Sequence, residues 1–226
     1  MRTKVVFVIV FIISSFSFIF SQTLEEKLLK KREQRIQNYT YQARNGARNS
    51  KLQVINSIIE EFDEVKYTEK DKKLVDLATY LSEEGSGRQE YENNRMINDY
   101  PDVRRGACVV LGMVGGDDAR TALINVLAND KNSTVKAEAL LALGKIKDNS
   151  NGEALRAIVY TYRTMYKPDN NFVMAVIQAV REMARSNAAS YGDAVIILSE
   201  IQMGQYTRVV REEAYKAIKY LNSVEE

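Results

Sequence analysis

The chain has 226 residues, of which 45% are hydrophobic and 27% are charged, with a single cysteine, two prolines and no histidine or tryptophan. The absence of histidine excludes imidazole-based zinc sites and serine–histidine triads, and a lone cysteine excludes an intramolecular disulfide. A net charge of only +2 argues against a nucleic-acid-binding protein, which normally concentrates positive charge.

Residues 1–21 have the composition of a secretory signal peptide. A positive start, Arg2 and Lys4, precedes an unbroken apolar run at residues 5–13. Small residues follow the run, at Ser14, Ser15, Ser17 and Ser21. We expect cleavage, with Ser21 favoured over Ser17 as the last residue removed, and therefore a periplasmic or secreted protein. The alternative is an uncleaved N-terminal membrane anchor, because the mostly apolar residues 5–20 approach the length of about 20 that a spanning helix needs.

The next segment, residues 22–47, is predicted to form a basic helix. Residues 23–50 carry seven basic and three acidic side chains, whereas residues 51–100 carry seven basic and twelve acidic ones. We therefore expect the helix to dock as a cap on the acidic unit that follows it. The alternative is a peripheral contact with a membrane surface, made by Lys27, Lys30, Lys31, Arg32 and Arg35.

From residue 48 onward, one apolar pattern returns four times. Each copy, which we call a core triplet, has three apolar residues spaced four apart: Val103/Ala107/Leu111, Val135/Ala139/Leu143, Phe172/Val176/Val180 and Val210/Ala214/Ile218. Such positions share one face of a helix, which indicates a buried face. The triplets start 32, 37 and 38 residues apart, the interval of a repeated helix–turn–helix unit. An amphipathic stretch precedes each triplet, so antiparallel helical hairpins are predicted, with first helices at about residues 72–82, 119–127, 154–165 and 194–203.

One connection is longer than the 2–8 residues usual between packed helices. It runs from Gly85 to Asp99, between the first amphipathic stretch and the first core triplet. Insertions in repeat proteins gather on one face, which often binds a partner; the alternative is a tolerated insertion. No strand is expected in the mature chain, because no stretch alternates polar and apolar residues for long.

Two segments resemble the second helix of HEAT repeats. They are residues 102–112 (DVRRGACVVLG) and residues 133–146 (STVKAEALLALGKI), and Asp130 lies five residues before Val135, where the family often has aspartate. The later copies depart from the pattern at Met174, Arg181 and Lys219. The resemblance is closest to short bacterial HEAT-like repeats of the bilin-lyase type. It implies an all-α, right-handed α-α superhelix, a HEAT/armadillo-like solenoid of about four to five helical hairpins over residues 48–226. The alternative is a four-helix bundle whose core happens to repeat.

The resemblance also implies that the second helices line a concave, partner-binding side. By spacing, the non-core positions there are Arg104, Arg105, Lys136, Glu138, Gln178, Arg181, Arg211, Glu212 and Lys219. For Arg104, Lys136 and Arg211, the alternative is a structural role as a bridge to carboxylates of adjacent units. Exposed tyrosines are further candidates for partner contacts, since tyrosine is favoured at interfaces; we select Tyr91 in the long connection and Tyr206 near the C-terminus.

Catalytic chemistry has little support. Cys108 has no histidine to activate it and lies within a core helix, so a buried, structural thiol is expected. The aspartates of Gly115-Gly116-Asp117-Asp118 fit a helix stop followed by a helix start better than a calcium loop. We therefore expect no catalytic residue, no metal site and no cofactor.

Three hypotheses remain. The leading one is an exported, non-catalytic protein-binding or scaffolding module of the cell envelope, with a protein or peptide partner. The others are a HEAT-like lyase-type enzyme and a membrane-anchored structural element.

Overall fold

The computed structural model describes residues 26–186 and 190–223, and the chain divides into two compact units, Met1–Tyr41 and Gln42–Glu226. The predicted signal peptide and its cleavage site lie outside the described residues. Residues 26–45 are helical, as predicted for the basic segment, and Lys27, Lys30, Lys31 and Arg35 are exposed while Arg32 is partly covered. The cap and membrane roles of this segment stay predictions.

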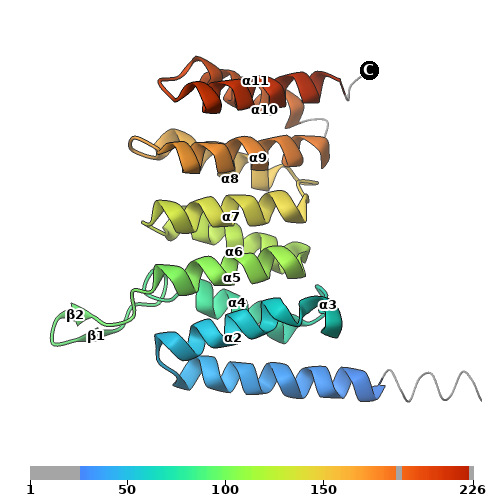
Figure 1. Ribbon diagram of the computed structural model, residues 1–226, viewed down its shortest axis with the longest axis vertical. Coiled ribbons are helices and arrows are strands. Elements are labelled where there is room, and N and C mark those ends of the chain that lie inside the picture. The colour runs from blue at the N-terminus through green and yellow to red at the C-terminus, as the bar shows by residue number, and fades with distance from the viewer. Residues whose placement is uncertain (1–25, 187–189, 224–226) are drawn as a thin grey trace, which may run out of the picture. The chain divides into compact units, whose positions relative to one another are not determined.

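The second unit is an all-α solenoid of stacked helical hairpins, as predicted. Its two layers are distinct in Figure 1. The first-helix layer contains α4 (Lys72–Ser82), α6 (Gly116–Asn129), α8 (Glu153–Thr164) and α10 (Tyr191–Met203). The second-helix layer contains α2 (Arg48–Glu60), α5 (Pro101–Val114), α7 (Ser133–Ile146), α9 (Asn170–Ser186) and α11 (Arg208–Asn222), each packed against the next. A short helix, α3 (Phe62–Val65), follows α2.

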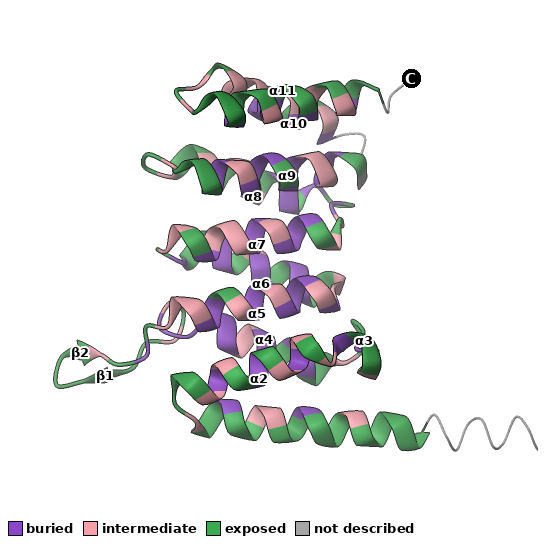
Figure 2. Ribbon diagram, viewed as in Figure 1, coloured by how far each residue is buried: buried purple, intermediate pink, exposed green. Residues whose placement is uncertain are grey.

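The core triplets form the buried seam between the two layers. Eleven of their twelve residues are buried, and Ile218 in α11 is partly exposed. Figure 2 shows the same burial as a recurring stripe along the second helices. Because a four-residue spacing keeps side chains on one face of a helix, the repeat of the triplet along the chain becomes a continuous apolar core through the stack.

In α5 and α7, the residue directly after each triplet member lies on the side of the helix that faces a neighbouring repeat. We call these residues the stacking column; in α5 they are Arg104, Cys108 and Gly112. A Cβ on Gly112 would lie 2.8 Å from the Cβ of Ala142 in α7, and one on Gly144, its counterpart in α7, would lie 3.3 Å from the Cα of Ala179 in α9. The glycines of the repeat pattern therefore let neighbouring second helices approach closely.

Cys108 is buried in this column, as predicted. Burial raises the pKa of its thiol far above the usual value, which leaves almost no thiolate at neutral pH. The turn after α5 also follows the prediction. Gly115 has φ of 73°, a backbone conformation that favours glycine, and Asp117 and Asp118 lie in the first turn of α6, where carboxylates are favourable.

The expectation of no strands is wrong within the long connection. Two short antiparallel strands, β1 (Tyr91–Glu92) and β2 (Arg95–Met96), form a hairpin that projects from the stack (Figure 1). The turn residues Asn93 and Asn94 both have positive φ, 48° and 65°. This is the pattern of a type I′ turn, in which asparagine is one of the favoured residues.

Candidate functional site

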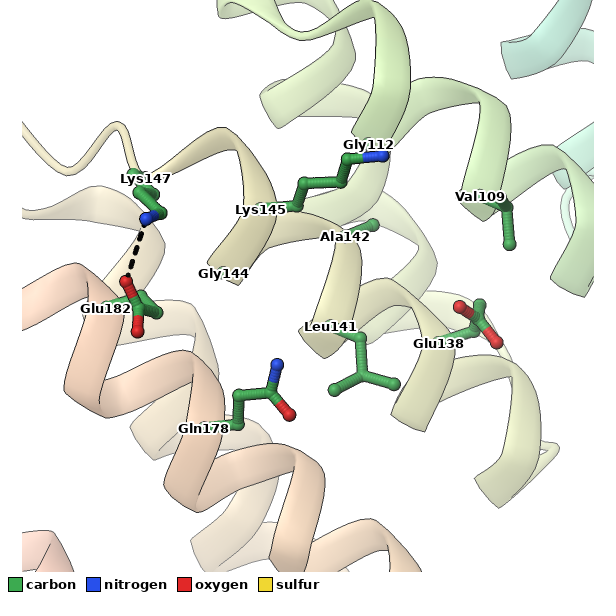
Figure 3. Close-up of a pocket in the computed structure, with 10 residues that line it drawn as sticks. All are labelled: Val109, Gly112, Glu138, Leu141, Ala142, Gly144, Lys145, Lys147, Gln178 and Glu182. Atoms are coloured by element: carbon green, nitrogen blue, oxygen red, sulfur yellow. Dashed lines mark ion pairs between the residues drawn. The ribbon is translucent and has the colours of Figure 1, made fainter. Parts of the chain in front are cut away.

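The second-helix layer carries an open groove across α5, α7 and α9. Two adjoining hollows form it, of about 490 Å³ and about 450 Å³, and both are lined by Glu138 and Leu141. Figure 3 shows Leu141 between Gln178 and Glu138, with Lys147 and Glu182 at the other end. We call this surface the second-helix groove.

The floor of the groove is apolar. Val109 of α5 and Leu141 of α7 are both partly exposed there, and each lies two residues after the middle member of its core triplet. Beside them are Gly112, Ala142 and Gly144, the small residues at which the helices come close together. The glycines that permit close stacking therefore also line one of the two hollows.

The charges of the groove differ in how well they are compensated. The Glu182 side chain is 14% exposed and has cations on two sides, with Lys147 Nζ and Arg181 Nη2 each 3.1 Å from a carboxylate oxygen. Burial alone would raise the pKa of Glu182, but the ion pairs with Lys147 and Arg181 outweigh it, and the pKa lies below its usual value.

Glu138 is in a different situation. Its side chain is 26% exposed, and Arg105 Nε lies 3.7 Å from Oε2, which is too long for a hydrogen bond. Burial raises the pKa of Glu138, and the charge of Arg105 offsets only part of this effect. The carboxylate at the junction of the two hollows is therefore incompletely compensated.

Arg104 was expected on this surface, and that expectation is wrong. It is 3% exposed and lies in the stacking column. Its Nε donates to Asp130 Oδ2 at 2.6 Å, and its Nη1 donates to Asp99 Oδ1 at 2.8 Å and to the Glu84 carbonyl at 2.7 Å. Asp130 belongs to the following hairpin, so Arg104 bridges neighbouring units, which is the structural alternative that the sequence left open.

The other predicted residues do not converge on one site. Arg105, Glu138 and Gln178 line the groove, and Arg181 lies beside it through its pair with Glu182. Lys136 is partly buried in the stacking column, and burial lowers its pKa. The remaining basic and acidic candidates, Arg211, Glu212 and Lys219, are exposed on α11.

The two selected tyrosines lie elsewhere. Tyr91 is exposed on the β-hairpin. Tyr206 is partly covered, and its hydroxyl is 3.1 Å from that of Tyr162, a contact between neighbouring hairpins. Neither residue lines the hollows of the groove.

Sequence reasoning missed most of the residues that line the groove, and Val109 and Leu141 of its floor are the first examples, followed by the charged residues Lys145, Lys147 and Glu182. A signal for the first two was present, because each lies two positions after the middle of a core triplet and is aliphatic where a solvated position would be polar. Helical spacing identifies the residues that are buried in the seam. It does not distinguish residues that are buried against the next repeat from those on the open face, because that difference depends on contacts between repeats.

A buried polar network holds the base of the β-hairpin. The Glu84 carboxylate is fully buried and pairs with Lys51 Nζ at 2.7 Å and with Arg88. It also accepts a hydrogen bond from Asn98 Nδ2 at 3.2 Å. Because Arg88 and Asn98 belong to the long connection while Lys51 belongs to α2, the network fixes the direction in which the hairpin leaves the stack.

Within residues 26–186 and 190–223, no helix has the length and apolar character required to span a bilayer. In the same part of the chain, no cluster of three or more acidic or cysteine side chains is placed to hold a metal ion.

Comparison with known proteins agrees with the stacked helical hairpins of the fold. Residues 94–167, which contain β2, α5, α6, α7 and α8, match the family model for HEAT repeats. A search of curated proteins finds no match to the chain. Repeats of this family generally mediate protein–protein interactions. This match covers about a third of the chain, and together with the stacked hairpins and the glycines of α5 and α7 it supports a HEAT-like repeat protein.

Proposed function

We propose that this protein is an exported, non-catalytic binding module that holds a protein or peptide partner of the cell envelope in its second-helix groove. The observation that carries the proposal is the groove itself, an open surface across three successive second helices with an apolar floor and charges of both signs. Partly exposed aliphatic residues with polar groups around them are typical of a protein interface.

An extended segment fits this surface better than a small molecule does. The two hollows adjoin through Glu138 and Leu141 and follow the stack, whereas small-molecule sites are concave and enclose most of their ligand. A chain that crosses three repeats makes many small contacts, which is the mode of binding that helical repeats offer.

The lyase-type enzyme is the weaker proposal. The chain has no histidine, and its single thiol is buried. A purified protein with a bound chromophore visible in its absorbance spectrum would favour the enzyme instead.

The proposal of export rests on the signal-like sequence of residues 1–21. N-terminal sequencing of protein recovered from cells tests it. A new N-terminus at Gln22 is the expected result, and Met1 retained in a membrane fraction would favour the anchored alternative.

Leu141→Arg is expected to lower partner capture at least tenfold, because a charged side chain replaces the aliphatic centre of the groove floor and desolvating it on binding is costly. Capture is measured by crosslinking in cells, followed by mass spectrometry. The matched control is Thr121→Arg, at an exposed position of α6 in the other layer. Unchanged capture by Leu141→Arg, with helical content intact by circular dichroism, would refute the groove as the binding site.

A further inference from the structure

We infer that the second-helix groove selects a partner segment in which a basic side chain is flanked by aliphatic ones, with Glu138 contacting the cation. This inference rests on the proposed function and specifies the chemistry of the partner. It starts from the unequal compensation of the charges around the groove floor.

Glu138 is more enclosed than the nearby cations. It lies midway along the groove, beside Leu141, with only a quarter of its side chain exposed. Arg105 is 57% exposed and Lys145 is also exposed, so these long side chains can swing into solvent when a partner binds. The shorter glutamate side chain has less reach toward solvent, so it stays closer to the surface that a partner would cover.

Covering the groove would remove most of the remaining water from Glu138. A carboxylate that loses water without gaining a partner is costly, and a cation brought by the ligand offsets that cost. The raised pKa that burial gives Glu138 shows that its surroundings already disfavour the charge before anything binds. A neutral or acidic side chain at this point would leave the carboxylate uncompensated.

The other carboxylate of the groove, Glu182, does not require a cation from the partner. Glu182 already has Lys147 and Arg181 within 3.1 Å, so a further cation would gain little there. Val109 and Leu141 supply apolar contacts on the same floor as Glu138. The preferred segment is therefore aliphatic on either side of one lysine or arginine, rather than uniformly basic.

The test is selection from a phage-displayed library of random peptides on the purified protein, followed by affinity measurement on a selected peptide. We expect lysine or arginine next to aliphatic residues to be enriched. Glu138→Gln should lower the affinity for the selected peptide about tenfold, an effect typical of losing a partly desolvated ion pair. Glu138→Lys should restore binding to the same peptide with its basic residue changed to glutamate.

Leu141→Arg separates this inference from the proposed function. If it abolishes peptide binding while the selected peptides show no basic preference and Glu138→Gln binds them normally, the groove is the site but the inferred specificity is wrong. If Leu141→Arg and Glu138→Gln both bind the selected peptides like the wild type, or if no peptide is selected, the groove proposal fails and the inference fails with it.

Discussion

Replacement of Arg104 by methionine is expected to lower the free energy of unfolding by about 3–5 kcal/mol, because removing one member of a buried ion pair leaves the other charge unpaired. Asp130, the partner left behind, is itself buried, 2.6 Å from Arg104 Nε. The Glu84 carbonyl would also lose its donor. Urea denaturation followed by circular dichroism measures the change. Hydrogen exchange should also show faster opening at the base of the β-hairpin, which Arg104 contacts through Asp99.

Two controls separate the buried pair from a general effect of losing an arginine. Arg105→Met, at the neighbouring exposed position, should change stability by less than about 0.5 kcal/mol. Arg104→Met combined with Asp130→Asn should cost clearly less than the sum of the two single variants, because the double variant leaves no buried charge unpaired. Additive effects would show that the two side chains do not depend on each other.

Gly112→Leu is expected to lower the free energy of unfolding by about 2–3 kcal/mol, since overpacking forces neighbouring helices apart. A Cβ at this position already meets the Cβ and Cα of Ala142, at 2.8 and 2.9 Å. Thermal or urea unfolding measures the loss. Because Gly112 also lines the groove, the spacing of the floor should change as well, and partner binding should weaken.

The matched control is Gly192→Ala in α10, where a Cβ would meet nothing within 4 Å. Only the higher helix propensity of alanine then affects stability, so the free energy of unfolding should stay the same or rise by up to about 1 kcal/mol. A Gly112→Leu variant as stable as the wild type would mean that α5 and α7 are not packed as closely as the backbone indicates.

The seam of the stack was predictable because it depends on one helix at a time. The spacing of Val103, Ala107 and Leu111 is enough to identify a buried face. The stacking column was not predictable in the same way, because Arg104 looks like any exposed arginine until Asp130 of the next hairpin is brought against it. Burial that results from contact with the next repeat produces no periodic sequence pattern within a single helix.

The same distinction explains the outcome at the groove and at the hairpin. Glu138 and Gln178 were correctly placed on the open face of the second helices, whereas Leu141 was overlooked because an aliphatic residue suggests a core position. The strands beside Asn93 and Asn94 are two residues each, too short for an alternating pattern, although the asparagine pair itself is a turn signal.

Photo-crosslinking in cells tests the central claim, that the second-helix groove is the partner-binding surface, most directly. A photoreactive amino acid replaces Gln178 in the groove or, as the control, Asn125 at an exposed position of α6 in the other layer. We expect a discrete protein adduct from position 178 and none from position 125. Adducts of equal yield at both positions, or none at position 178, would contradict it.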